Sequence, residues 1–157
     1  MMSKIITLTQ SKEAIVDDDM FEYLNQWQWY YNAGYAVRAV GKHRHQKHIY
    51  MHREIMHTPD GMETDHINGN GLDNQRANLR ACTTSQNQAN SNKQRNNTSG
   101  YKGVCFIKRD NKWRASVIIN KKYKSIGSFE NPIDAAKAYD KKAKELFGSF
   151  ARLNFPE

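Results

Sequence analysis

The sequence predicts an α+β fold that is built from short antiparallel strands and a few helices. Two observations carry this prediction. Three runs between residues 101 and 129, "YKGVCFI", "KWRASVII" and "KYKSIGSF", alternate as strands do, and "INKK" is typical of a hairpin turn. The run "NPIDAAKAYDKKAKELFG" at 131–148 has helical periodicity. We therefore expect a three-stranded antiparallel sheet packed on one helix at this end of the chain.

The signals at both ends of that helix are strong. Asn131 is a favoured N-cap, Pro132 suits the first turn, and Gly148 stops the helix. One face carries small and aromatic side chains that would let the helix approach a sheet closely, namely Ala136, Tyr139, Ala143 and Leu146 or Phe147.

The first sixty residues are expected to form short strands and a turn of helix. Trp27, Trp29 and Tyr31 alternate with other residues, a period of two that suits a half-buried strand. Their rings are expected to form core rather than to stack on bases. Further along, Thr84 or Ser85 would cap a short helix.

The charge distribution divides the chain. The net charge is +8 and the pI about 9.5, which favours a polyanionic partner such as nucleic acid or an anionic membrane surface. Residues 1–99 hold 11 Lys and Arg against 10 acids, whereas residues 100–157 hold 13 against 6. All six histidines lie in the first half. The basic end and the end suited to proton chemistry are therefore different.

Other classes of protein are disfavoured. Cys82 and Cys105 stand alone, so we expect neither a disulfide framework nor a thiolate zinc site. The sequence shows no apolar run of membrane-spanning length and no signal peptide at its start. We expect an intracellular, cytoplasmic protein with no membrane partner.

The segment "TDHINGNGLDNQRANLR" at 64–80 contains a candidate reaction centre. Asp65 offers a carboxylate for a hard divalent cation, and a neutral His66 can take a proton from water, as phosphodiester hydrolysis requires. Neighbours on a strand point to opposite faces unless the strand ends, and the following Asn-Gly turn provides such an end. From these residues alone, an ordinary solvated hairpin remains the alternative.

Four blocks in order, "MHRE" at 51–54, "DHINGN" at 65–70, "LDNQRANLR" at 72–80 and "SQNQAN" at 85–90, resemble the HNH endonucleases, specifically the phage and mobile-intron homing type. The resemblance implies a ββα-metal hairpin and helix that cuts DNA with one divalent cation. That cation is usually Mg²⁺, with Mn²⁺ as the substitute. If the protein is phage-encoded, it would act in the host cell cytoplasm.

The resemblance also implies roles for residues. His66 becomes the general base, Asp65 a metal ligand, and Asn78 the residue that orients the histidine. Asn87 would complete the metal site through its side-chain oxygen. One carboxylate and one amide leave most positions to water and phosphate oxygens, which suits Mg²⁺ better than zinc.

Several nearby residues have weaker assignments. Asn74 and Asn90 are candidates for the same roles as Asn78 and Asn87 and rank below them, since turn and cap positions explain them equally well. His52 and Arg53 match the family's His-Arg block and would either hold a phosphate or only pack on the hairpin. The histidines at 42–48 are interpreted as a solvated basic hairpin tip rather than a metal site.

The C-terminal end resembles a second family. The motifs "SGYKGV", "KWRASV", "SIGSFENPIDAAKAYDKKA" and "FGSFARLNF" follow the order of the ethylene-response-factor (apetala-type) DNA-binding domain. This implies that three strands pack on one helix and that the free face of the sheet enters the major groove of double-stranded DNA. If Val104, Phe106, Ala115, Val117 and Ile126 face the helix, the free face carries Cys105, Ile107, Arg109, Arg114, Ser116, Ile118, Tyr123 and Ser125.

Plant members of that family place several Arg and Trp on the free face, and this chain departs from them. Its binding is therefore expected to depend on phosphates, which leaves its sequence preference open. The candidate DNA-binding residues are Arg53, Arg80, Lys93, Arg95, Lys102, Lys108, Arg109, Lys112, Arg114, Lys122 and Lys124.

Lys93 and Arg95 lie in a polar run that is expected to link the two modules and to track the minor groove. Replacing both by alanine should weaken DNA binding and flatten its salt dependence, measured by fluorescence anisotropy with a random-sequence duplex. Unchanged affinity and slope would remove the linker from the DNA interface.

The sequence thus predicts four segments: an N-terminal part at 1–60 that packs on the nuclease, the ββα motif at 61–90, a linker at 91–99 and a DNA-binding domain at 100–157. The expected function is a sequence-directed DNA endonuclease, either a nickase or a double-strand cutter, that acts as a monomer or weak dimer. A non-catalytic DNA-binding regulator is the alternative, and an RNA-directed or structure-selective nuclease is less favoured.

Overall fold

The computed structural model describes residues 2–42 and 45–156, so positions 43 and 44 of the basic cluster at 42–48 lie outside the described residues. The chain forms two compact units that divide between Cys82 and Thr83, and each is described by itself. Both mix helices with small antiparallel sheets, which confirms the α+β class.

A hairpin opens the N-terminal unit. Strand β1 (Ser3–Thr7) pairs with β2 (Glu13–Asp17), and helix α1 (Asp18–Asn25) follows directly. The inward residues of β2, Ala14 and Val16, are fully buried. This hairpin therefore packs into the core of the unit and is not an exposed extension.

A second sheet has the order β3-β4-β5, from β3 (Tyr30–Asn32), β4 (Tyr35–Val40) and β5 (Lys47–Tyr50). Helix α2 (Met51–Met56) continues from β5. The two-residue turn between β3 and β4 holds positive φ angles at Ala33 and Gly34, as tight hairpin turns require.

The strand predicted from the alternating aromatics at 27–31 begins only at Tyr30. Trp29 lies before it, buried, with its indole Nε1 donating to the Leu24 carbonyl at 2.8 Å. Trp27 packs edge-on against Trp29 with ring centroids 6.4 Å apart. The rings do form core, as predicted, but they do so by covering the end of α1. The core of the unit includes Ile6, Leu8, Ala14, Val16, Leu24, Trp29, Ala36, Met51, Ile55 and Leu79.

The hairpin that carries the candidate centre closes the unit. Strand β6 (Glu63–His66) pairs with β7 (Leu79–Cys82) in antiparallel register. A loop that ends in the 3₁₀ turn Arg76–Asn78 connects them. The predicted strand end after His66 is present, and it places the histidine at the rim of the hairpin.

The C-terminal unit begins with helix α3 (Thr84–Asn90). Its cap is Thr83, one residue before the predicted positions, because the Thr83 hydroxyl accepts from the Gln86 amide while the Gln86 side chain accepts from the Thr83 amide. The polar run at 91–99, predicted as a linker, belongs to this unit. Asn97 and Ser99 tie it to the carbonyl of Tyr101.

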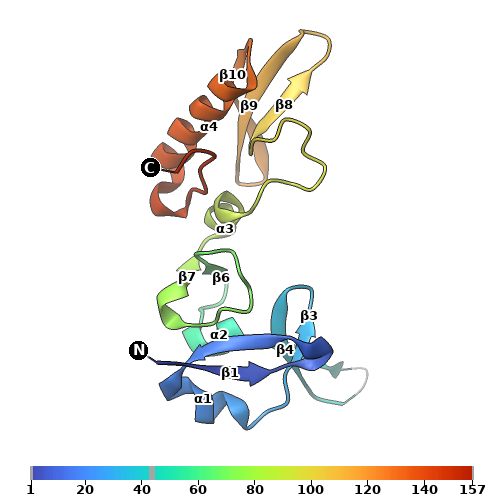
Figure 1. Ribbon diagram of the computed structural model, residues 1–157, viewed down its shortest axis with the longest axis vertical. Helices are drawn as coiled ribbons and strands as arrows, with labels where there is room; N and C mark the ends of the chain where they lie inside the picture. Colours follow the sequence, from blue (N-terminus) through green and yellow to red (C-terminus); the bar gives the residue numbers. More distant parts are fainter. Residues whose placement is uncertain (1, 43–44, 157) are drawn as a thin grey trace. The chain divides into compact units, whose positions relative to one another are not determined.

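The predicted sheet and helix follow. Strands β8 (Val104–Ile107), β9 (Lys112–Ile119) and β10 (Lys122–Phe129) form a meander, and helix α4 (Pro132–Phe147) lies along one face of it (Figure 1). Asn120 and Lys121 hold positive φ in the β9–β10 turn. The caps of α4 are also confirmed: the Asn131 side chain accepts from the Asp134 amide, and Gly148 ends the helix. The buried residues between sheet and helix are Val104, Ala115, Val117, Ala135, Ala136, Tyr139 and Ala143.

Two details of this core differ from the prediction. Phe106 shares the inward face but is 39% exposed, because it lies on edge strand β8 and packs on Trp113 instead of on α4. Of the two alternatives predicted for the end of the helix, Phe147 packs on the core and Leu146 is exposed. The helices of the described part of the chain are too short or too polar to span a membrane.

Candidate active site

His66 lies at the end of β6 and is only 5% exposed. Its ring Nε2 lies 3.2 Å from the Oδ1 atom of Asn74. An amide oxygen only accepts, so Nε2 carries the proton of this hydrogen bond. A neutral ring with its proton on Nε2 keeps its lone pair on Nδ1, which makes Nδ1 the basic atom of the site.

Asn74 is fixed in this orientation by the N-terminal hairpin. Its backbone N–H donates to the Ile15 carbonyl at 2.8 Å, and the Ile15 N–H donates to the Leu72 carbonyl at 2.8 Å. The Asn74 amide group then donates from Nδ2 to the Leu72 carbonyl at 3.3 Å. With Nδ2 used in this way, Oδ1 faces the histidine. Strand β2 therefore fixes the loop at 72–74, and Asn74 of this loop positions His66.

Asn78 was predicted to orient the histidine, with Asn74 ranked below it. In the structure Asn74 accepts the hydrogen bond from His66. The Asn78 side chain accepts from the Asn68 amide at 3.0 Å and donates to the Asp73 carbonyl at 2.8 Å. These bonds close the loop between β6 and β7 and direct Asn78 away from the ring. Asn90 is buried at the end of α3, in the C-terminal unit.

Three further rings form a cluster with the ring of His66. His52 meets His66 edge-on with ring centroids 4.9 Å apart, and Tyr35 lies 5.9 Å from His66 and 5.3 Å from His52. Tyr50 completes the group, 5.5 Å from His52. Burial lowers the pKa of His66, against the opposing effect of the Asn74 hydrogen bond and of Asp65. The ring cluster, Tyr35, Tyr50, His52 and His66, therefore favours a neutral imidazole.

His52 is also buried, and its pKa is lowered further. Burial first, and then the charges of His66 and Arg53, lower its pKa to about 3. Its Nδ1 atom has no hydrogen-bond partner among the described residues. A proton there would be a buried charge without a counter-ion, so His52 packs as a neutral ring in this structure.

This burial makes folding stability depend on pH. Below pH 6.5 the unfolded chain protonates His52 and the folded chain does not, so stability is present above that pH and is lost as the pH falls toward 3. Between pH 7.5 and 5, His52 should cost the wild type about 2 kcal/mol. Urea unfolding of wild type and His52→Phe at both pH values measures the difference. Equal losses in the two proteins would contradict the buried neutral state.

Asp65, 4% exposed, forms an ion pair with Arg80 across the hairpin. Both Nε and Nη2 of the guanidinium lie 2.8 Å from the same carboxylate oxygen, Oδ2. The side chain of Arg80 is only 16% exposed. Arg80 was predicted to contact DNA, and the structure places it on the carboxylate instead, because it directly faces Asp65 in the strand register.

The donors around Asp65 fit a hard cation better than a soft one. Within residues 2–42 and 45–156, no group of three or more His, Cys, Asp and Glu gathers as a metal cage. A carboxylate oxygen suits Mg²⁺, which retains several of its waters. The other predicted ligand, Asn87, lies on α3 in the C-terminal unit, partly buried.

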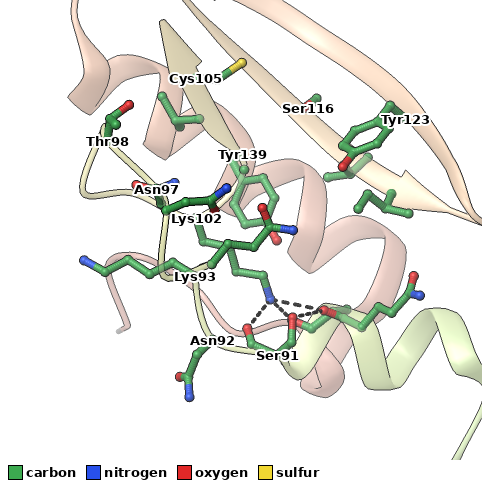
Figure 2. A pocket seen from close by; sticks show the side chains of 18 of the residues that line it. Ser91, Asn92, Lys93, Asn97, Thr98, Lys102, Cys105, Ser116, Tyr123 and Tyr139 are labelled. Atoms are coloured by element: carbon green, nitrogen blue, oxygen red, sulfur yellow. Dashed lines mark hydrogen bonds between the residues drawn. The ribbon is translucent and has the colours of Figure 1, made fainter.

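Two more predicted DNA contacts have structural roles. Arg53 on α2 donates from Nη1 to the Met62 carbonyl at 3.1 Å and so joins α2 to the segment before β6. In the C-terminal unit, the ammonium of Lys102 donates to three carbonyls at the end of α3, those of Ala89 at 2.5 Å, Ser91 at 2.6 Å and Gln88 at 3.4 Å (Figure 2). A cation at a helix C-terminus satisfies carbonyls that have no partner within the helix.

Lys102 is one of the residues that line a pocket of about 510 Å³, together with residues of the sheet and of the segment at 91–98 (Figure 2). Lys102→Met should free the end of α3 and raise amide hydrogen exchange of residues 86–91 about tenfold, since these bonds replace ones that the helix lacks. Mass spectrometry on the full chain measures it, with the exposed Lys108→Met as the matched control. Equal exchange in both variants would contradict the capping role.

The other predicted cations divide by their partners. Arg109 pairs with Asp110 at 2.7 Å and Lys112 with Glu130 at 2.9 Å. Lys93 donates to the Gly100 carbonyl at 2.9 Å. All three are surface contacts that cost little to break, so they stay available to phosphates. The remaining predicted cations are exposed, namely Arg95, Lys108, Arg114, Lys122 and Lys124.

The strand register confirms most of the predicted free face, but Arg109 lies in the turn between β8 and β9. Tyr123 opposes Ile118 and Ser125 opposes Ser116 across β9 and β10, and Cys105 opposes Arg114 across β8 and β9. Tyr123 is 73% exposed. The sheet face thus offers one aromatic ring, small hydroxyl groups and one Arg, which are few groups for contacting base edges. The cations around the face are more numerous and suit phosphates.

Sequence reasoning missed Tyr35 and undervalued Asn74. Tyr35 gave no local signal, because only the pairing of β3 with β4 brings it onto the histidines. Asn74 depends on its bond to Ile15, which no pattern around residue 74 discloses.

Known proteins resemble this chain in the same two regions. An HNH endonuclease family model matches residues 56–89 and an AP2 domain model matches residues 99–149. An uncharacterized HNH endonuclease of Acanthamoeba polyphaga mimivirus is 34% identical over 143 residues, 90% of this chain and 74% of the relative. Protein 3.8 of Escherichia phage T7 is 35% identical over 95 residues, 60% of this chain and 78% of the relative. No solved structure matches.

The mimivirus likeness spans both units, and the two family models fall on the hairpin with α3 and on the sheet with α4. The chain therefore belongs to the HNH endonuclease family and carries a C-terminal AP2 DNA-binding domain.

Proposed function

We propose that this protein is a homing-type endonuclease that hydrolyses a phosphodiester bond of double-stranded DNA with one divalent metal ion and His66 as the general base. The observation that carries the proposal is the hydrogen bond between His66 Nε2 and Asn74 Oδ1 inside the ring cluster. It supplies a neutral imidazole with a fixed ring plane and a defined basic nitrogen, which is what a general base needs.

In the proposed mechanism, Nδ1 of His66 takes a proton from water as that water attacks phosphorus in line. Asn74 stabilises the resulting imidazolium, because its Oδ1 accepts a hydrogen bond from the Nε2–H group. Asp65 and Asn87 are the residues that would hold Mg²⁺ or Mn²⁺. The ion, when bound, stabilises negative charge on the phosphate and on the departing 3′ oxygen. Burial of the ring cluster limits the access of other water to the base.

The C-terminal module would bring the enzyme to DNA. Its sheet face has one exposed arginine, and exposed lysines line the strands and turns around it. Phosphate contacts of this kind position a protein without reading bases, so we infer moderate sequence preference and a strong dependence of affinity on salt.

Supercoiled plasmid tests the proposal. Wild-type protein should convert it to nicked or linear DNA with Mg²⁺ or Mn²⁺ and should not do so in EDTA. Retarded but intact plasmid under every condition would favour the alternative function, a non-catalytic DNA-binding regulator that keeps the hairpin as scaffold. Cleavage that EDTA does not stop would reject the metal-dependent mechanism.

A further inference from the structure

An open recess of about 320 Å³ adjoins the ring cluster in the N-terminal unit. Lys12 and Tyr31 form one side, Tyr35 and the turn before it form another, and residues 69–72 form the third. None of the predicted site residues lines it. We call it the Lys12 recess.

Tyr35 connects the recess to the catalytic base. Its ring lines the recess and also lies 5.9 Å from the ring of His66. The loop at 69–72 follows directly on the strand that ends in His66. Whatever fills the recess therefore lies one aromatic ring away from the atom that is proposed to activate water.

The recess keeps its shape because one glycine allows two segments to touch. A Cβ atom on Gly71 would lie 2.4 Å from the Gly34 carbonyl oxygen and 2.7 Å from the Tyr35 ring, closer than atoms approach. The loop after β6 is thus pressed against the β3–β4 turn. The walls are set by backbone contacts, and the recess is preformed rather than opened by a side-chain rotation.

Its chemistry suits a nucleotide. The ammonium of Lys12 lies 5.8 Å from the centroid of the Tyr31 ring, and the Tyr31 backbone N–H donates to the Thr9 hydroxyl at 3.1 Å, which fixes the strand beneath the ring. Lys12 is exposed and forms no ion pair in the described structure. A cation beside two phenol rings complements the phosphate and the sugar of one nucleotide.

We propose that the Lys12 recess binds a nucleotide of duplex DNA that flanks the phosphate facing His66, with Lys12 on its phosphate and Tyr31 and Tyr35 against its sugar. The proposal rests on the proposed function for the location of the scissile phosphate. It adds an N-terminal DNA contact, contributed by the loop between β1 and β2 and by β3 and β4, to the contacts of the C-terminal module.

The test uses the full chain with the His66→Ala substitution, so that bound DNA stays intact, and a random-sequence 30-bp duplex in fluorescence anisotropy between 50 and 300 mM salt. Lys12→Ala should weaken binding about fivefold to tenfold at 0.1 M salt and lower the salt slope by about one, the effect of one lost phosphate contact. Tyr31→Leu should weaken binding about threefold with an unchanged slope, since it removes a ring face and no charge.

Lys4→Ala is the matched control, because Lys4 also lies over an aromatic ring, Phe21 at 4.8 Å, but outside the recess. Equal affinities and slopes for the Lys12 and Lys4 variants would overturn the proposal. The measurement needs no cleavage. If the wild type fails to cut plasmid while Lys12→Ala still loses one unit of slope, the nuclease function fails and the nucleotide site remains.

Discussion

Replacing His66 by alanine is expected to slow DNA cleavage about a thousandfold at saturating Mg²⁺ while DNA affinity stays within about twofold of wild type. General-base catalysis by a positioned side chain contributes roughly 10²–10⁴ to a rate, and alanine leaves no group to accept the proton. Binding should survive because the cations that surround the sheet of the AP2 domain lie outside this site. Single-turnover nicking of supercoiled plasmid and anisotropy on a 30-bp duplex measure the two quantities.

The control for this variant is His48→Ala. His48 is exposed on β5, where its Nδ1 atom lies 2.6 Å from the Tyr30 hydroxyl. It does not belong to the ring cluster. It should cleave at the wild-type rate. Cleavage by His66→Ala at the wild-type rate would reject His66 as the base. Loss of both cleavage and binding would mean that the histidine is needed for the fold, a possibility that His66→Gln addresses because glutamine keeps polarity and bulk.

Arg80→Ala is expected to lower the free energy of unfolding of the N-terminal unit by about 3 kcal/mol. The substitution removes the partner of a buried carboxylate, and a buried charge without compensation is costly. Asp65 is 4% exposed and receives both guanidinium N–H groups on Oδ2, so water has little access to replace them. Urea denaturation, followed by Trp fluorescence of the full chain with Trp113→Phe, reports on this unit, which contains Trp27 and Trp29.

A second substitution separates the charge from the packing. Asp65→Asn in the Arg80→Ala background should restore part of the lost stability, since the amide carries no charge to bury. Arg76→Ala is the surface control: its ion pair with Asp19 joins side chains 43% and 61% exposed and should be worth less than 1 kcal/mol. Equal losses for the Arg80 and Arg76 variants would show that the Asp65 pair is solvated in solution.

The parts of the fold that sequence predicts well are those with local causes. Helix α4 has its cap at Asn131 and its stop at Gly148 within its own segment, and the strands of the AP2 domain alternate apart from a register shift in β10 between Ser125 and Gly127. Trp29 shows the limit of such patterns. An aromatic residue at every second position occurs both in strands and where rings cover the end of a helix. At Trp29 the hydrogen bond to the Leu24 carbonyl fixes the second arrangement, and the local sequence pattern does not reveal it.

The candidate site divides in the same way. The hairpin and its histidine follow from the Asn-Gly turn and the HNH resemblance. The partner of the histidine does not, because Asn74 and Asn78 have similar spacing and the choice is made by Ile15, almost sixty residues earlier in the chain. Lys102 and Arg80 show why charge alone misassigns contacts: both guanidinium and ammonium groups find buried acceptors that a count of basic residues does not include.

The bond between Ile15 and the loop at 72–74 bears on how this enzyme can be engineered. The family match begins at residue 56, which suggests a short, portable cassette that could be fused to other DNA readers. Such a graft would leave behind the strand that orients Asn74, and with it the tautomer of the imidazole. A fusion that preserves the orientation of Asn74 therefore has to include the N-terminal hairpin from β1 onward, together with the hairpin that carries His66.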